Sequence, residues 1–420
     1  MPNRPTASDK GLIRDPNFRV FWGGQALSQF GAQFAELAIP VLAVLLLHAT
    51  DAQVGYLNAA GTAAFLLVGL PAGAWIDRLR KRRVMILADG VRAAALAAVP
   101  LLHLTGHLQL WHLYVVALVI GVATVFFDVS YQSIVPSLVD GGQIAEANGK
   151  LESTSQLAGL TGPALAGWVV GLVSAPFAIL ATAVTYLCSL IALVFVRDRE
   201  VPRPREEHAP LRTEIAEGLR WVFGNPLLRR IVGTTAIGNG FTTIVFTLLP
   251  ILLLRVIGFS PEAMGLLFTF SAVGGLLGAL ATPRLVTWIG EARLVPVAAI
   301  GMSLSTLPLP LAVLLPTGWA FVVLAVQGAF MSLSVVAYNI TQVTFRQRIT
   351  PTRLLGRMNA SIRFCVWGIM PVAALAAGWL GTWLGTVPAI WVGVIGGAFS
   401  ALPVVIGPFW RMRELPQAAE

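Results

Sequence analysis

Long apolar stretches recur along almost the whole chain, and short polar segments separate them. About 20 apolar residues in a helix cross a bilayer core of about 30 Å. Only 12% of the residues are charged, whereas a soluble domain has about 25%. We therefore expect an all-α membrane protein. Twelve membrane-spanning helices are predicted near residues 18–47, 53–76, 84–104, 110–138, 150–172, 175–196, 227–255, 262–286, 293–315, 318–346, 355–384 and 386–410.

The cations cluster in alternate connecting segments, and only Arg92 and Arg255 lie outside these groups. By the positive-inside rule, these segments and both termini are expected in the cytoplasm. We predict a multi-pass protein of a bacterial inner membrane, with no cleavable signal peptide and no disulfide. The net charge of +9 then reflects orientation in the lipid bilayer, and no nucleic-acid partner is expected.

One polar segment, 197–226, divides the chain nearly in half, and its second part has apolar residues at helical spacing. We interpret that part as an amphipathic helix along the cytoplasmic face. The predicted organisation has five parts. These are a cytoplasmic N-terminus (1–17), a six-helix bundle (18–196), the linker (197–226), a second six-helix bundle (227–410) and a cytoplasmic tail (411–420).

The two halves resemble each other at a nearly constant offset. Pro40 and Pro250 are 210 residues apart, as are Gly55 and Gly265. Asn148 precedes a Gly-Trp pair at 167–168 by the spacing with which Asn359 precedes a second pair at 378–379. Several matches at one offset indicate two parallel repeats, which in transporters place a binding site near mid-membrane between the halves.

The loop between the second and third spans reads Gly73-Ala-Trp-Ile-Asp77-Arg78-Leu-Arg80-Lys81-Arg82-Arg83. It resembles the motif Gly-x-x-x-Asp-Arg-x-Gly-Arg-Arg of the major facilitator superfamily, except that Arg80 replaces the second glycine. The resemblance implies the major facilitator fold, with twelve helices in two six-helix pseudo-repeats. It also implies that Asp77 lies against the start of helix eleven, near residues 354–357, and locks the halves together.

Residues 159–167 of the fifth span resemble the Gly-Pro motif of antiporters in that superfamily, with matches at Gly162, Pro163 and Gly167. Packing of small residues against a neighbouring helix is an alternative explanation. The nearest resemblance is to the twelve-span drug:proton antiporter branch that includes macrolide-efflux and enterobactin-exporter proteins. Two stretches carry it, 76–82 and 133–163.

Glu36 is the acidic residue that lies deepest in the first span, about 22 Å beyond Phe21 at 1.5 Å per residue. Gln25, Gln29 and Gln33 precede it at helical spacing, so one face of this helix is polar. A buried carboxyl that takes up a proton can couple transport to protons. Two alternatives stay open: a contact to a cationic substrate, and a protonated structural glutamate.

Asp89, Arg92 and Asp128 are the other charges expected inside the first-half spans. Their similar depths predict that Arg92 pairs with Asp128 or Asp89. The resemblance places Asp128 in the charge network of the motif aspartate, and Asp128 is a second candidate for proton coupling. A static ion pair is the alternative. The residues expected in a conformational latch are Gly73, Asp77, Arg78, Arg82, Asp89, Arg92 and Asp128.

The second half offers polar and aromatic side chains for a substrate cavity rather than titrating groups. Ordinary packing is the alternative for each of them. The predicted cavity residues of both halves are Gln29, Gln33, Glu36, Asn239, Thr242, Phe246, Gln327, Tyr338, Asn339, Arg363 and Trp367, with Phe330 and Gln342 as further candidates.

These features predict a secondary transporter that exports an amphipathic small molecule, drug-like or siderophore-like, in exchange for protons by alternating access. An importer or facilitator of the same fold and a non-transporting scaffold are the alternatives. No nucleophile triad, metal cluster or phosphate-binding glycine loop is visible, so we expect no enzyme activity, no metal and no cofactor other than the coupling proton. A monomer is expected.

Overall fold

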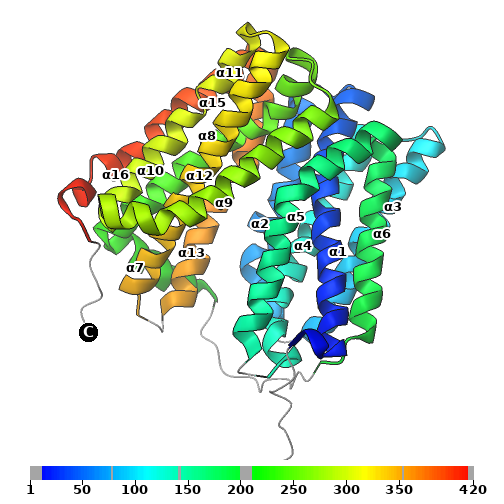
Figure 1. Ribbon diagram of the computed structural model, residues 1–420, viewed down its shortest axis with the longest axis horizontal. Helices are drawn as coiled ribbons and strands as arrows, with labels where there is room; N and C mark the ends of the chain where they lie inside the picture. Colours follow the sequence, from blue (N-terminus) through cyan, green and yellow to red (C-terminus); the bar gives the residue numbers. More distant parts are fainter. Residues whose placement is uncertain (1–11, 77–78, 141–142, 199–210, 352–353, 415–420) are drawn as a thin grey trace, which may run out of the picture.

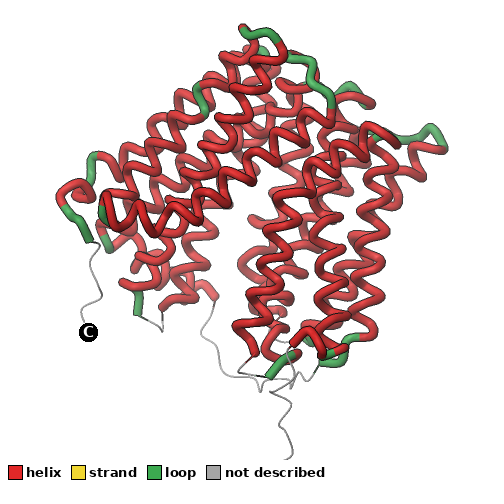
Figure 2. The backbone as a smooth tube through the Cα atoms, in the orientation of Figure 1, coloured by secondary structure: helices red, strands yellow, loops and turns green. Residues whose placement is uncertain are grey.

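The structure is a computed structural model that describes residues 12–76, 79–140, 143–198, 211–351 and 354–414, and the described chain is helical with short connections (Figures 1 and 2). The first half contains α1 (Pro16–Val41), α2 (Asp51–Ile76), α3 (Lys81–Leu104), α4 (Leu110–Leu138), α5 (Ile144–Val173) and α6 (Ala175–Phe195). The linker contributes α7 (Leu211–Gly224). The second half contains α8 (Pro226–Ile251), α9 (Pro261–Ile289), α10 (Glu291–Ser305), α11 (Pro308–Leu311), α12 (Thr317–Ile349), α13 (Leu355–Trp367), α14 (Ile369–Leu384), α15 (Thr386–Ala398) and α16 (Leu402–Val405).

Eleven stretches of described residues are long and apolar enough to cross a membrane. The 26-residue helix α2, whose only charged residue is Asp51 at its start, lies between the first two of them. Together they correspond to the twelve predicted spans. Three spans are built from consecutive helices rather than one: α10 with α11, α13 with α14, and α15 with α16. The predicted amphipathic helix of the linker is α7.

Prolines explain several of these breaks, because proline has no N–H to donate to the carbonyl four residues before it. Pro308 and Pro310 interrupt the ninth span, and Pro371 follows the break at Gly368. Pro40 in α1 likewise cannot donate to the carbonyl of Glu36. After Pro40 and Pro250 both helices widen into a π-helical turn, η3 (Leu42–Leu46) and η5 (Leu252–Val256). The two turns lie 210 residues apart, as the repeat predicts.

Both halves have the same helix neighbours. In the first half, α2, α4, α3, α6, α1 and α5 are consecutive neighbours. In the second half the corresponding order is α9, α12, α10, α15, α8 and α14. Figure 1 shows the two bundles beside each other, with the described ends of the chain and α7 at one end of the molecule. That end is named the termini side here, and the opposite end the far side.

Glycines bring helices of the two halves into contact on the far side. A Cβ on Gly55 of α2 would lie 2.7 Å from the Cα of Gly378 in α14. A Cβ on Gly265 of α9 would lie 3.2 Å from the Cα of Gly167 in α5. The glycines that reveal the repeat in the sequence are therefore the ones at which its copies meet, since only a residue without a side chain fits there.

Hydrogen bonds reinforce the contact on the far side. The Asn58 amide donates to Thr247 at 2.6 Å, and the Thr386 hydroxyl donates to Asp51 at 2.8 Å. Arg255, at the end of the seventh span, donates to the backbone carbonyls of Ala49 and Val44. The second half thus places its one far-side arginine on the end of the first span.

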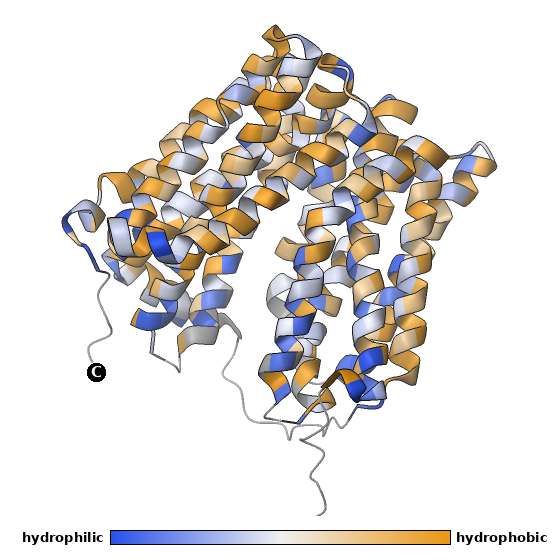
Figure 3. Cartoon of the chain, viewed as in Figure 1, coloured by the Kyte–Doolittle hydropathy of each residue, from blue (hydrophilic) through white to orange (hydrophobic). Residues whose placement is uncertain are grey.

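Toward the termini side, the ribbons of the two halves diverge (Figure 1). Among contacts between described residues, those of Phe65 with Trp367 and Leu66 with Gly368 join α2 to the eleventh span near its break. Residues of hydrophilic type gather at the termini side, while the outer faces are mostly hydrophobic (Figure 3). The two halves are thus in contact on the far side, and their ribbons diverge toward the termini side.

Candidate functional site

Glu36 is exposed although it lies well inside a spanning helix. Leu27, which is 47% exposed, precedes it by nine residues and so points to the opposite side of α1. Gln29 precedes Glu36 by seven residues and points to the same side. The carboxyl therefore lies away from the apolar stripe that α1 presents outward. It has no ion pair or hydrogen bond with another described residue.

The side chains on the polar face of α1 become more exposed from Gln25 toward Glu36. Gln25 is 2% exposed, and neither of its side-chain polar atoms has a hydrogen-bond partner among the described residues. Gln29 and Gln33 are half-buried. Gln33 packs on α5, where a Cβ on Gly162 would come within 2.7 Å of it. Gly162 thus gives α1 room to carry this polar face beside α5.

Arg92 forms the centre of a buried charge cluster in the first half. It pairs with Asp89, as the sequence predicts for one of its two candidate partners. The guanidinium carbon lies 4.1 Å from the ring centre of Phe127 and 4.3 Å from that of Tyr186. Two cation–π contacts and an ion pair hold this charge inside the bundle.

Asp128, in contrast, is exposed. It lies within electrostatic range of Arg92 in its own half and of Arg363 in the second half. Its carboxyl has no ion pair or hydrogen bond with another described residue. Asp128 is therefore the acidic group that connects the buried cluster electrostatically with the other bundle.

The predicted latch is only partly within the described residues. Asp77 and Arg78 lie outside them, and Gly73 is in the last turn of α2. Arg82 donates through Nε to the carbonyl of Leu193 at 2.8 Å and through Nη2 to that of Val194. It thus binds the end of α6 in its own half rather than the second half. The latch itself stays a prediction.

The antiporter-type motif lies at two helix contacts. Gly162 faces Gln33 of α1, as described above. A Cβ on Gly167 would lie 2.6 Å from the carbonyl oxygen of Pro261 at the start of α9, and the carbonyl group of Pro163 faces Gly265 of α9. The motif therefore packs the fifth span simultaneously against the helix of Glu36 and against the second half.

On the second-half side, three predicted cavity residues share one face of α8. Asn239, Thr242 and Phe246 follow one another at spacings of three and four. The Asn239 amide donates to the carbonyl of Val366 at 3.1 Å, which ties this face to α13. Phe246 occupies the position of Glu36 in the repeat, since the two are 210 residues apart.

Arg363 and Trp367 lie one turn apart on α13. The guanidinium carbon of Arg363 is 5.4 Å from the ring centre of Trp367. The Trp367 ring in turn meets the Phe65 ring of α2 edge-on at 4.9 Å. Arg363 is exposed and lies one turn toward the termini side from this contact between the halves.

Three residues of α12 that are predicted for the cavity lie elsewhere: Tyr338, Gln327 and Phe330. Tyr338 is 1% exposed, with its hydroxyl 3.0 Å from that of Thr235 and directed at the carbonyl of Ile231. Gln327 and Phe330 line a mainly apolar pocket of about 430 Å³ beside the break between α10 and α11. Neighbours in sequence point about 100° apart on a helix, so Asn339, which is also predicted for the cavity, is exposed while Tyr338 is buried.

Arg346 is a further candidate site residue. The sequence alone does not distinguish it from the basic residues of the loop that follows. It lies inside α12 and shares a face with Gln342, four residues before it, and with Asn339, seven residues before it. That spacing is the signal by which it could have been found. Among described residues, no group of three or more His, Cys, Asp or Glu side chains is arranged to hold a metal ion.

Comparison with known proteins identifies the family. Residues 21–373 match the Major Facilitator Superfamily. The chain belongs to this superfamily. It is 27% identical over 333 residues to the multidrug efflux pump Tap of Mycolicibacterium fortuitum, which covers 77% of each chain. It is 24% identical over 351 residues to macrolide efflux protein A of Streptococcus pyogenes, which covers 81% of this chain and 83% of that protein.

Solved structures show the same fold. A bacterial homologue of the iron transporter ferroportin in an inward-facing state superposes with a TM-score of 0.75 at 16% identity, covering 94% of this chain and 99% of that one. The nucleoside transporter NupG gives a TM-score of 0.68 at 14% identity, with 93% and 98% covered. The chain is thus a membrane transporter of the major facilitator fold.

Proposed function

We propose that this transporter exports an amphipathic small molecule, drug-like or siderophore-like, in exchange for protons. The observation that carries the proposal is Glu36, an unpaired carboxyl in the middle of a spanning helix and on its polar side. A charge there costs about 3 kcal/mol on insertion scales. A proton removes that cost when the site is closed to water. The efflux activity named for two relatives supports the direction of transport.

The proposed cycle has two states. With the termini in the cytoplasm of a bacterial inner membrane, the structure represents the state open to the cytoplasm, in which substrate enters between the halves. Protons on Glu36 and Asp128 accompany the state open to the outside, and their release to the cytoplasm accompanies the return. We further propose that one chain is sufficient and that the proton is the only coupling ion.

The experiment uses purified protein in proteoliposomes and the amphipathic dye Hoechst 33342 as the probe. Wild-type protein should move the dye against its gradient only when a pH gradient is imposed. Glu36→Gln, which keeps the size of the side chain but cannot ionise, should abolish this dependence. Glu152→Gln, at an exposed acidic residue of α5, is the matched control and should transport normally.

The alternatives give different results. Dye that only equilibrates, without regard to the pH gradient, would indicate a facilitator, and uptake in the opposite direction would indicate an importer. A protein that moves none of a panel of amphipathic compounds would favour a scaffold. If Glu36→Gln retains full proton dependence, Glu36 does not carry the coupling proton.

A further inference from the structure

Two arginines in the second half lack the oxygen partners that comparable arginines have. Arg230, Arg255 and Arg357 each donate to a carbonyl or carboxylate oxygen. Arg346 and Arg363 make no hydrogen bond or ion pair through their side chains with another described residue. The Nε of Arg346 is buried without a partner. A buried N–H without a partner costs free energy unless something binds it.

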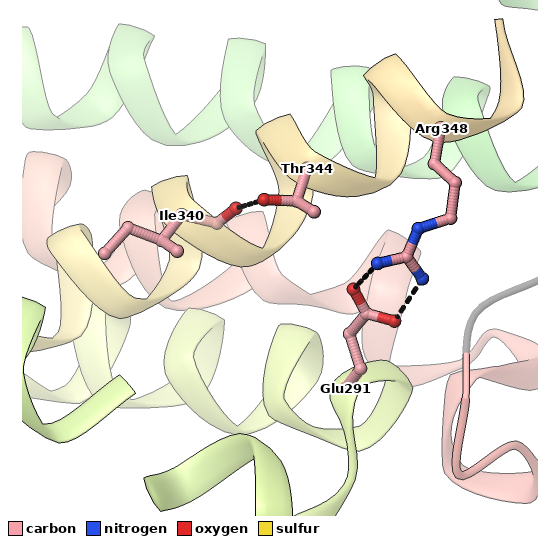
Figure 4. Close-up of polar contacts among 4 residues, drawn as sticks. All are labelled: Glu291, Ile340, Thr344 and Arg348. Carbon is pink, nitrogen blue, oxygen red and sulfur yellow. Dashed lines mark hydrogen bonds and ion pairs between the residues drawn. The ribbon is translucent and has the colours of Figure 1, made fainter. Parts of the chain in front are cut away.

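The second half contains no carboxylate that could pair with them. Between residues 227 and 410 the only acidic residues are Glu262 and Glu291. Glu262 lies on the far side at the start of α9. Glu291 is held by both terminal nitrogens of Arg348, at 2.9 and 3.1 Å (Figure 4). Asp128 of the first half lies within electrostatic range of Arg363.

The directions of α12 and α13 tilt the Arg346 and Arg363 side chains toward the same depth. Side chains on a helix lean toward its N-terminus. α12 runs toward the termini side, so Arg346 leans away from that side and into the membrane. α13 runs in the opposite direction, so Arg363 leans toward the termini side. The two lie within electrostatic range of each other. Two positive charges within electrostatic range repel each other, and an anion bound between them offsets that repulsion.

The surroundings suit an amphipathic anion. The Arg363 guanidinium lies over Trp367, and Trp367 meets Phe65 of the other half. A stacked guanidinium keeps the N–H groups of its edge free for the two oxygens of an oxyanion. The aromatic pair offers apolar surface beside it. The Phe65–Trp367 contact joins the two halves, so a transported molecule bound beside it would contact both halves.

We propose that Arg346 and Arg363 bind an oxyanion group, such as a carboxylate, of the transported molecule, whose apolar part lies against Trp367 and Phe65. This inference rests on the proposed function and adds amphipathic anions to the molecules that the site can bind. An anion on Arg363 takes the place that otherwise faces Asp128. Substrate binding to Arg363 therefore weakens the electrostatic attraction between Asp128 and the second half.

The test compares two probes of similar size and shape, the anion 2-naphthoate and its neutral amide 2-naphthamide. Binding to the full chain in phosphatidylcholine nanodiscs is followed by quenching of tryptophan fluorescence. Wild-type protein should bind naphthoate more tightly than naphthamide. Arg346→Gln and Arg363→Gln should each weaken naphthoate binding roughly tenfold or more and leave naphthamide binding unchanged. Arg348→Gln, at an arginine of α12 that is already paired, should retain the preference.

Equal affinity for the two probes, or unchanged naphthoate binding in both variants, would overturn the inference. Loss of naphthoate binding on replacing part of the lipid with phosphatidylglycerol would also overturn it, because it would assign the arginines to a lipid headgroup. Proton-driven transport of Hoechst 33342 reports separately on the proposed function. That transport can persist when the anion site fails, so the two failures are distinguishable.

Discussion

At the scale of single residues, Arg92 shows how a charge is kept inside a membrane bundle. Asp89 pairs with it, and its guanidinium makes cation–π contacts with Phe127 and Tyr186. The pair with Asp89 follows from the spacing of three in the sequence. The two aromatic contacts do not, because they come from α4 and α6, and only the packing of those helices brings them together.

Arg92→Met should strongly destabilise the protein, because it leaves Asp89 buried without its counter-ion. Breaking a buried pair costs about 3–5 kcal/mol. The double variant Asp89→Leu with Arg92→Met should recover much of that loss. Denaturant-induced unfolding of the wild type, Arg92→Met and the double variant measures this recovery. A double variant no more stable than Arg92→Met alone would contradict the account of the cluster.

Arg255 allows a second prediction at this scale. Its two hydrogen bonds to Ala49 and Val44 join the halves on the far side. Arg255→Gln should weaken closure there, and hydrogen bonds to charged groups contribute about 1.5–3 kcal/mol. Hydrogen exchange of residues 42–50 should therefore become faster. Arg284→Gln, at an exposed arginine of α9, should leave exchange in this segment unchanged, and equal rates in both variants would rule out the role of Arg255.

At the scale of helices, the repeated glycines have a structural purpose that their spacing alone does not reveal. Gly55 meets Gly378, and Gly265 meets Gly167, so the paired copies form the contact between the halves. The sequence predicts the repeat and the number of spans. It does not predict the helix breaks near Gly368 and Thr306, because prolines are tolerated in membrane helices and only some of them interrupt the helix.

Gly55→Val should prevent α2 and α14 from closing on the far side. Its Cβ would lie 2.7 Å from the Cα of Gly378, which is backbone and cannot move aside. Asn58→Cys, in a background without Cys188 and Cys365, should then react several times faster with an impermeant maleimide. Gly159→Val, at a position in α5 with nothing within 4 Å, should leave the rate unchanged. A rate unaffected by Gly55→Val would mean that these glycines do not hold the closed side.

The candidate site was only partly predictable at this scale as well. The polar face of α1 follows from the spacing of its glutamines, and Glu36 lies on it. On α12 both Tyr338 and Asn339 are predicted for the cavity, but Tyr338 turns into the core while Asn339 is exposed. In a helix that is apolar almost all round, periodicity does not identify the side that faces the other half.

At the scale of the whole molecule, the contacts favour one of two arrangements. The two bundles have the same helix order and meet on the far side through glycines, Arg255 and the Asn58–Thr247 hydrogen bond. They diverge toward the termini side (Figure 1). Alternating access requires that the bundles rock about the level of Glu36 and Trp367, so that one side opens as the other closes.

Distances between spin labels measured on both sides test this account most directly. One label pair, at Thr105 and Thr317, spans the halves on the far side, and another, at Ser153 and Thr344, spans them on the termini side. The protein is measured in nanodiscs in alkaline and acidic buffer, with Hoechst 33342 present. The account predicts that acidification lengthens the far-side distance and shortens the termini-side distance. Two distances that stay fixed, or that change in the same direction, would contradict it.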